Sequence, residues 1–342
     1  MASYYRRIIN NFWSGTSGAA STSGMLKAWL DSFPKNADGF INISDERRFA
    51  HDETEYDTQY NNDPSNFASG AGLIKTLKEM DADFSCPAIE VGCGTGVLTL
   101  GLVKEQAFPL LLATDPSSIF LKLTRKKCVD AGVDTSRLVL GVLDGSDVAM
   151  LPPQSLSLIT LRSVLHHILD VDSFIAAASR ALVPSGVLAF EEPCAEAFIL
   201  MGGIAQFLPV LARASGRSLS EEDATTVKNF LDTMAFYCRR DVDKSQAEDK
   251  HCFRVEDIAG FAGASGLGMK FIPGVGFEGG TPDRFAAGFR AYLKYCMSWG
   301  EDLLRLFDEL LMPMASKIDE FTAGGPPPPI SGTFICRKRG FT

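Results

Sequence analysis

The sequence has no Cys-x-x-Cys pair and no group of Cys and His residues at the spacing of metal ligands. This absence excludes the common structural zinc sites and a disulfide framework. The eight cysteines lie far apart along the chain: Cys86, Cys93, Cys128, Cys194, Cys238, Cys252, Cys296 and Cys336. We interpret them as reduced thiols, and we expect a cytoplasmic protein with no bound metal.

Long basic blocks and uninterrupted apolar runs are also missing. The net charge is −9 and the basic residues are scattered, which disfavours nucleic acid as a partner. The most apolar stretch, residues 197–214, follows Glu196 and contains a glutamine, a proline and an arginine, so we expect no membrane span. The first residues are charged and lack the apolar core expected of a signal peptide.

The composition that is present is typical of a globular protein with a substantial core. Hydrophobic residues make up 46% of the 342 positions and charged residues 22%, which leaves room for one large or two ordinary domains. From residue 88 onward, short apolar runs alternate with segments of helical spacing. This alternation predicts a doubly wound α/β fold with a mostly parallel sheet.

The central motif is AIEVGCGTGVL, residues 88–98. Its first four residues are an apolar run, Gly92, Gly94 and Gly96 follow at alternate positions, and helical spacing begins at Val97. The pattern predicts a strand, a tight turn and a helix start, where glycines let a ligand approach the backbone and the helix offers unpaired N–H groups. A tight turn without any ligand is the alternative.

Single positions exclude two other nucleotide-binding patterns. Val97 stands where a dinucleotide fingerprint needs a glycine, and no Lys-Ser or Lys-Thr follows the glycines as in a phosphate-binding loop. Acidic Glu90 would repel a pyrophosphate and suits a ligand with an ammonium group or hydroxyls. The stretch EVGCGTG resembles the first motif of the class I S-adenosylmethionine-dependent methyltransferases of the small-molecule type.

Acidic residues end the next two predicted strands. The run FPLLLATD ends at Asp115, where a carboxylate can accept hydrogen bonds from both hydroxyls of a ribose or cap the helix that follows. The predicted strand over residues 137–143 is followed by Asp144, which the resemblance places on the exocyclic amine of adenine. The resemblance implies these cofactor-binding residues: Tyr60, Glu90, Gly92, Cys93, Gly94, Gly96, Asp115, Pro116, Leu143, Asp144 and Arg162.

Titratable pairs follow the fourth and fifth predicted strands, which cover residues 156–161 and 187–190. The first pair is His166 and His167, and the second is Glu191 and Glu192. Ligands of an open parallel sheet lie off the carboxyl ends of its strands, so we expect one histidine as a general base and the glutamates as substrate contacts or a second base. In the alternative, one histidine packs or caps and the other hydrogen-bonds to the backbone.

The expected sheet has seven strands, the last of them antiparallel. We divide the chain into a helical N-terminal extension (1–67), a cofactor-binding core (68–193 and 254–277), two helical insertions (194–253 and 278–330) and a last core strand (331–342). Residues 239–250, within the first insertion, are charged and are interpreted as solvated. The insertions are expected to form either a lid over an apolar acceptor or an oligomer contact.

Tyr56 and Tyr60 precede the first strand of the core. The resemblance implies a lid over the cofactor at this position, and aromatic anchoring of a surface turn is the alternative.

The predicted function is transfer of a methyl group from S-adenosylmethionine to a small, partly apolar acceptor, with oxygen favoured over carbon or nitrogen, leaving S-adenosylhomocysteine. A small-molecule substrate is therefore the expected partner. One alternative is a catalytically silent subunit that binds the cofactor, disfavoured by the intact glycine loop and both acidic strand ends. The other is a nicotinamide-dependent oxidoreductase, disfavoured by Val97.

Overall fold

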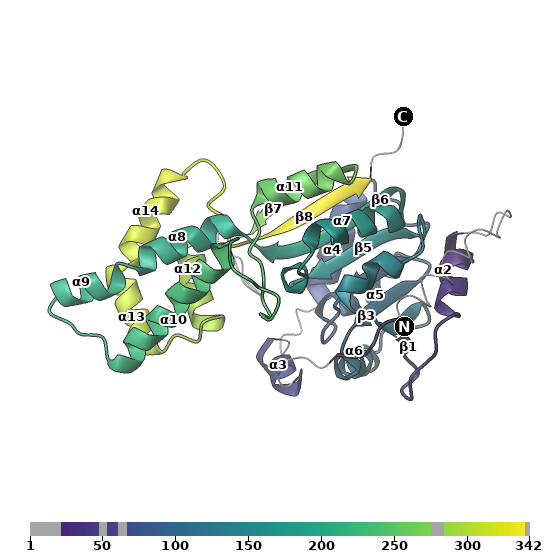
Figure 1. The fold of residues 1–342 in the computed structure, drawn as a ribbon, viewed down its shortest axis with the longest axis horizontal. Helices are drawn as coiled ribbons and strands as arrows, with labels where there is room; N and C mark the ends of the chain where they lie inside the picture. The colour runs from purple at the N-terminus through teal and green to yellow at the C-terminus, as the bar shows by residue number, and fades with distance from the viewer. Residues whose placement is uncertain (1–21, 48–52, 61–66, 275–283, 339–342) are drawn as a thin grey trace.

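The computed structural model describes residues 22–47, 53–60, 67–274 and 284–338, and these contain an eight-stranded sheet with the order β1-β4-β3-β2-β5-β6-β8-β7. The strands are β1 (Ile41–Asn42), β2 (Ala88–Val91), β3 (Leu111–Asp115), β4 (Leu138–Val142), β5 (Leu156–Arg162), β6 (Leu182–Pro193), β7 (Leu267–Gly274) and β8 (Ser331–Lys338). Neighbouring strands are parallel except that β8 is antiparallel to both β6 and β7. The predicted doubly wound sheet with an antiparallel last strand is confirmed (Figure 1).

The structure adds a strand that the sequence pattern did not predict. β1 pairs with β4 at the edge of the sheet, through Ile41 opposite Gly141 and Asn42 opposite Val142. Two residues are too few to show the alternation of a strand in the sequence. The strand matters because the chain that continues from it, as far as Arg47, reaches the carboxyl ends of β3 and β4.

Helices cover both faces of the sheet. They are α2 (Thr22–Leu30), α4 (Phe67–Glu79), α5 (Val97–Glu105), α6 (Ser118–Asp130), α7 (Val171–Ala181) and α11 (Val255–Ala264), with 3-10 turns η2 (Gly145–Met150) and η3 (Leu165–His167). Helix α3 (Glu53–Tyr60) instead contacts α6 through Tyr56 and Phe120. Alternate residues of β6 point to opposite faces of the sheet. Leu188 and Phe190 pack in the core under α2, α7 and α11. Val187 and Ala189 pack in the core under α4 and α5.

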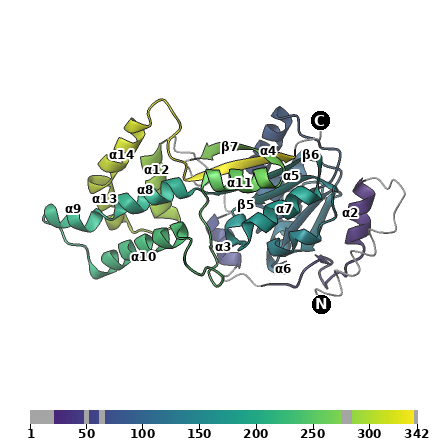
Figure 2. The same cartoon turned by 45° about the horizontal axis from the view of Figure 1, so that its top comes forward.

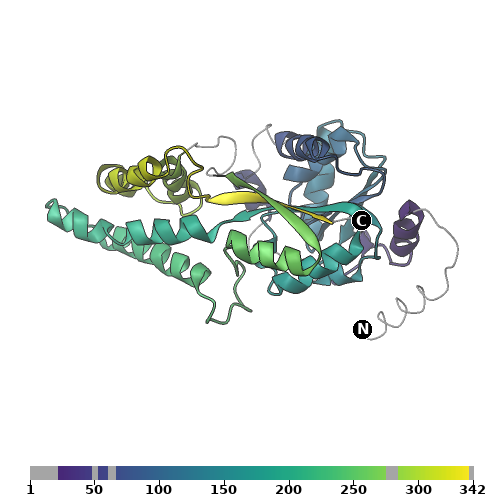
Figure 3. The same cartoon turned by 90° about the horizontal axis from the view of Figure 1, so that it is seen from above.

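A second body is built from the two insertions. Its helices are α8 (Ala195–Ala205), α9 (Leu208–Ala214), α10 (Glu221–Cys238), α12 (Phe285–Tyr295), α13 (Glu301–Leu310) and α14 (Met312–Phe321). Phe230, Phe289 and Phe307 are fully buried in a core that these helices form with one another, and the body lies beside the sheet in Figures 1 and 2. In Figure 3 the teal α8 and α10 lie on one side of this body and the yellow-green α12 to α14 on the other.

Backbone hydrogen bonds join the two bodies where the chain passes between them. Cys194 N donates to Ile330 O at 2.9 Å, Ala195 N donates to Phe253 O at 2.8 Å, and Ile330 N donates to Gly274 O at 2.9 Å. These bonds tie the end of β6 to the chain segments that enter α11, leave β7 and enter β8. The helical body is thus hydrogen-bonded to the edge of the sheet.

One expectation about membranes requires correction. Residues Ala195–Ala214, which contain α8 and α9, are long and apolar enough to cross a membrane by length and composition, with a mean hydropathy of 1.7. Half of this window is buried inside the protein, and Phe198, Met201 and Leu208 belong to the core of the helical body. The glutamine and proline therefore did not shorten the stretch below spanning length. Its other face is open, because Ile199, Phe207 and Val210 are exposed.

Helices α4 and α5 meet at glycines. A Cβ added to Gly70 would lie 2.5 Å from Leu102 N, which is closer than real Cβ atoms approach backbone, whereas a Cβ on exposed Gly72 would meet nothing within 4 Å. We expect Gly70→Ala to lower the free energy of unfolding by about 1–3 kcal/mol, because the helices must separate. Gly72→Ala is expected to raise it by about 0.5–1 kcal/mol through lower backbone entropy of the unfolded chain. Urea unfolding of both variants checks the contrast, and equal effects would contradict it.

Candidate active site

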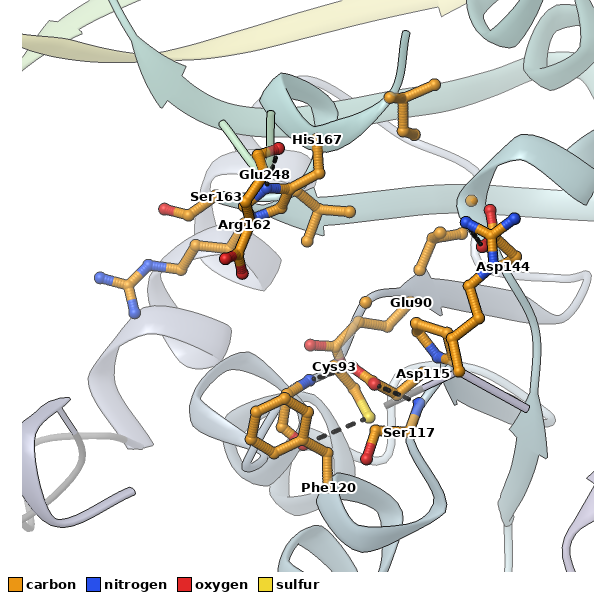
Figure 4. A pocket seen from close by; sticks show the side chains of 18 of the residues that line it. Glu90, Cys93, Asp115, Ser117, Phe120, Asp144, Arg162, Ser163, His167 and Glu248 are labelled. Atoms are coloured by element: carbon orange, nitrogen blue, oxygen red, sulfur yellow. Dashed lines mark hydrogen bonds and ion pairs between the residues drawn. The ribbon is translucent and has the colours of Figure 1, made fainter. Parts of the chain in front are cut away.

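A cavity of about 560 Å³ lies at the carboxyl ends of β2, β3, β4 and β5. Figure 4 shows its labelled side chains in two groups: Glu90, Cys93, Asp115, Ser117, Phe120 and Asp144 at one end, and Arg162, Ser163, His167 and Glu248 at the other. Gly92, Gly94 and Pro116 also line it. The two ends combine the predicted cofactor residues with one of the predicted histidines.

The glycine turn between β2 and α5 forms one wall. Gly92 has φ +69° and Gly94 has φ +51°, the left-handed conformations that side chains disfavour. A Cβ on Gly92 would lie 2.5 Å from Val164 Cγ2, so this glycine allows the loop after β5 to approach the turn. A Cβ on Gly94 would meet nothing within 4 Å and would project into free space beside the cavity wall. Gly96 instead packs against Thr124 and does not line the cavity.

Asp115, at the end of β3, is 5% exposed and holds two loops together. Its Oδ2 accepts a hydrogen bond from Gly94 N at 2.9 Å, and its Oδ1 accepts one from Ser117 N at 2.9 Å. Asp115 is not the N-cap of α6, since Ser117 occupies that position, and the Ser117 side chain makes no capping hydrogen bond. Each carboxylate oxygen can accept more than one hydrogen bond, and Asp115 lines the cavity.

Glu90 is a buried carboxyl group of the cavity. It shares a sheet face with Ala88, under α5, and accepts a hydrogen bond from Thr99 Oγ1 at 2.6 Å. Burial raises the pKa of Glu90 to about 8, although the Thr99 hydrogen bond lowers it. The nearby charge of Asp115 adds to the increase. A cation entering the cavity would favour the ionised form.

Asp144 follows β4 and is held by groups that the sequence did not reveal. Its Oδ1 accepts from Ser146 N at 2.9 Å, and its Oδ2 lies 2.8 Å from Arg47 Nη1. Arg47 also donates its backbone N–H to Pro116 O at 2.9 Å and lines the cavity. In the sequence, Arg47 is one of several scattered basic residues and carries no signal of a site. The pairing of β1 with β4 brings it to this edge of the sheet.

The two tyrosines of the expected lid and the predicted cofactor residue Leu143 lie in different places. Tyr56 lines the cavity and makes an edge contact with Phe120, with ring centroids 5.6 Å apart. Tyr60 is the last residue of α3, and its side chain lies outside the described residues. Leu143 is fully buried in the core rather than lining the cavity.

Glu192, at the end of β6, organises the loop that follows β5. Its side chain is fully buried, and its Oε1 accepts from Val164 N at 2.8 Å and Leu165 N at 2.5 Å. Its Oε2 lies 2.6 Å from His166 Nδ1. Glu192 does not line the cavity, and neither does Glu191, whose carboxylate lies 3.4 Å from Arg162 Nε.

His166 is held between two carboxylates. Nδ1 faces Glu192, and Nε2 lies 3.5 Å from Asp249 Oδ1. Burial lowers the pKa of His166, but the charge of Glu192 and the hydrogen bonds to both carboxylates outweigh burial and raise it to about 10. His166 is therefore an imidazolium at neutral pH and does not line the cavity, which argues against it as the base.

His167 differs from His166 both in its position and in the direction of its pKa shift. It lines the cavity, and its Nδ1 lies 3.1 Å from Glu248 O and 3.2 Å from Asp249 Oδ1. Both oxygens can only accept, so Nδ1 carries the proton and Nε2 keeps its lone pair in the neutral ring. Burial and then the charge of His166 lower the pKa of His167 below its ordinary value of 6.5.

The segment between α10 and α11, residues 239–254, completes the cavity, and we call it the strap. Ser245, Glu248 and Lys250 line the cavity, and Lys250 N donates to His166 O at 2.8 Å. The interpretation of residues 239–250 as solvated is therefore wrong for this part of the strap. A run of alternating charges carries no signal that distinguishes a solvated loop from one that folds against a site.

The strap also creates the one group of potential metal ligands within the described ranges. The ligand atoms of His166, His167 and Asp249 lie within 4.8 Å of one another. Each of these atoms is already within hydrogen-bonding or ion-pairing distance of another member or of Glu248 O. We therefore assign the group to hydrogen bonding.

Comparison with known proteins places this site in a family. Residues 89–188, which contain the glycine turn and both acidic strand ends, match the family model described as a methyltransferase domain. These residues are a methyltransferase domain. This domain includes η3 and ends within β6, so Glu192, the strap and the helical body lie outside the matched residues.

Relatives of the methyltransferase domain match it over similar lengths. An uncharacterized protein of Synechococcus is 35% identical over 29% of this chain and 24% of its own length. A ubiquinone biosynthesis O-methyltransferase of Pasteurella multocida is 28% identical over 30% of this chain and 44% of its own. The chain thus spans less than half the length of these relatives.

Solved structures that match the chain include a phosphoethanolamine N-methyltransferase 2 of Haemonchus contortus. It was solved with phosphomonomethylethanolamine and S-adenosylhomocysteine. It is 15% identical over 94% of this chain and 61% of its own, with a TM-score of 0.44.

The pKa of Glu90 gives a stability test. Folding raises this pKa from 4.5 to about 8, so the contribution of Glu90 to stability is complete below pH 4.5 and is lost as the pH rises through 8. Glu90→Gln does not titrate, and we expect its stability relative to the natural chain to rise by about 1.4 kcal/mol per pH unit over this range. Urea unfolding between pH 5 and pH 8 measures the difference, and parallel pH curves would refute the burial effect.

Proposed function

We propose that the protein is an S-adenosylmethionine-dependent methyltransferase that acts on a small acceptor carrying a hydroxyl group. The observation that carries the proposal is one cavity lined by the open glycine turn, the strand-end carboxylates and His167, whose Nδ1 is held by the Glu248 carbonyl so that its Nε2 keeps the lone pair. Its volume of about 560 Å³ is that of a small-molecule site.

The cavity residues fit the cofactor in shape and in charge. Free space at Gly94 lets a ligand contact the backbone, as the first methyltransferase motif requires. Asp115 would accept hydrogen bonds from the ribose, Asp144 would accept from the adenine amine, and Glu90 would face the positive charges of the methionine part. When bound, the cofactor supplies a methyl group on a positively charged sulfur, which a nucleophile displaces in line.

The chain's contribution to the chemistry is orientation and proton removal. His167 Nδ1–H is fixed by Glu248 O and Asp249, so its Nε2 can accept the proton of an acceptor hydroxyl. The imidazolium of His166 beside it favours the neutral ring of His167. At neutral pH the base is therefore unprotonated and ready to accept a proton.

The surroundings of His167 favour a polar acceptor. Ser163, Ser245 and Lys250 line that end of the cavity together with Ile168 and Leu169. Among the described residues, no helix of the insertions lines the cavity, so the expected apolar lid is not the source of acceptor specificity. The O-methyltransferase among the relatives supports oxygen as the methyl acceptor.

Gly94 provides a test of cofactor binding. Gly94→Ala places a methyl group where we propose that the cofactor lies against the backbone, so we expect at least a tenfold loss of S-adenosylmethionine affinity by calorimetric titration. Gly132→Ala is the matched control, because Gly132 also has positive φ, has nothing within 4 Å of its Cβ and lies outside the cavity. Both variants should lose about 1–2 kcal/mol of stability, and equal affinities in the two would contradict the assignment.

His167 provides a test of catalysis. We expect His167→Gln to reduce turnover about 100- to 10,000-fold with little change in cofactor affinity, because proton removal is lost. The natural chain should keep its activity as the pH falls to 6.5, since the pKa of His167 lies below that value. Methyl transfer to a library of hydroxylated acceptors, detected by mass spectrometry, measures both effects. His251→Gln, in the strap but outside this cavity, should retain full turnover.

A further inference from the structure

Asp249, in the strap, makes three polar contacts without lining the cavity. Its Oδ1 lies 3.2 Å from His167 Nδ1 and 3.5 Å from His166 Nε2, and its Oδ2 accepts a hydrogen bond from Tyr237 Oη at 3.0 Å. The contacts to the histidines hold the pKa of Asp249 at about 2 although burial alone would raise it. Asp249 is therefore a carboxylate at any working pH.

Tyr237 connects this carboxylate to the helical body. It lies at the end of α10 and packs against Phe198 of α8, with ring centroids 6.3 Å apart. Burial raises the pKa of the Tyr237 hydroxyl, so it stays protonated and can only donate to a carboxylate. Tyr237, Asp249 and His167 thus form a continuous chain of contacts from the second body to the cavity.

We infer that Asp249 and Tyr237 are positioning residues, through which the helical insertion fixes the ring orientation and the tautomer of His167. This inference rests on the proposed role of His167 as a base. The Glu248 carbonyl alone would leave the ring free to turn about its single hydrogen bond. A second acceptor at Asp249, itself held by Tyr237, fixes the ring with Nε2 toward the cavity.

The charged groups around His167 predict how its pKa changes when Asp249 is neutralised. Asp249 lies on the strap side, His166 lies against the ring at a centroid distance of 4.0 Å, and Glu192 lies behind His166. His166 keeps its contact with Glu192 when Asp249 is neutralised, so its positive charge next to His167 remains. Loss of the Asp249 charge is therefore expected to lower the pKa of His167 further.

Asp249→Asn is the main test. An amide can donate to Nδ1 and so favour the tautomer protonated at Nε2, which cannot accept a proton. We expect kcat to fall about tenfold or more with unchanged KM and cofactor affinity, and the acid limb of the pH profile to move to lower pH. Tyr237→Phe should cause a smaller loss in the same direction. Asp241→Asn, which breaks an exposed ion pair with Arg239 in the same strap, is the matched control and should retain full activity.

A spectroscopic readout separates this inference from the proposed function. Long-range ¹H–¹⁵N correlation spectra of the full chain labelled at its four histidines report the tautomer of His167 without turnover. The inference predicts an Nδ1–H tautomer in the natural chain and a shift toward Nε2–H in Asp249→Asn. If His167→Gln kept full turnover, the base assignment would fail, yet the spectra would still decide the positioning. An unchanged tautomer and full kcat in Asp249→Asn would overturn the inference, as would a stoichiometric divalent metal that this variant loses.

Discussion

A carboxylate removed from water needs donors around it, and at the end of β6 the Glu192 carboxylate receives them from Val164 N, Leu165 N and His166 Nδ1. These bonds fix the backbone that follows β5, including Ser163 with its positive φ of 54°. The fixed loop packs Val164 against Gly92 and carries His167 to the cavity. The geometry of both ends of the cavity therefore depends on one buried carboxyl group that does not line the cavity.

The adjacent residues His166 and His167 differ in charge. His166 is flanked by two carboxylates and is positively charged, and its charge helps to keep His167 neutral. The sequence placed both rings at the same strand end and predicted that at most one faces the site. Which of them does so depends on Glu192 and Asp249, which lie 26 and 83 positions beyond His166 in the chain.

Local patterns explain how much could be predicted from the sequence. The glycine turn, Glu90 and Asp115 lie at strand ends that a short apolar run identifies. β2 forms with the expected bounds, and β3 ends at Asp115 as expected but begins at Leu111, three residues into the apolar run. Arg47 and Asp249 could not be found in this way. Arg47 is brought to the site by a two-residue edge strand, and Asp249 by a polar segment whose fold depends on the helices before and after it. The fifth strand, expected over residues 187–190, begins earlier, at Leu182, and contains Ser185 with a φ of +70° that the pattern of residues does not reveal.

The hydrogen-bonded junction at Cys194, Phe253 and Ile330 bears on how such chains can be shortened. Excising the segment between β6 and α11 would leave a minimal sheet domain whose matched region is complete. That domain would nevertheless lack the Glu248 carbonyl that anchors the imidazole ring of His167. A compact homologue without this segment would have to recruit another acceptor at that ring nitrogen, and so the inserted helices and the loop after β5 are constrained to change together.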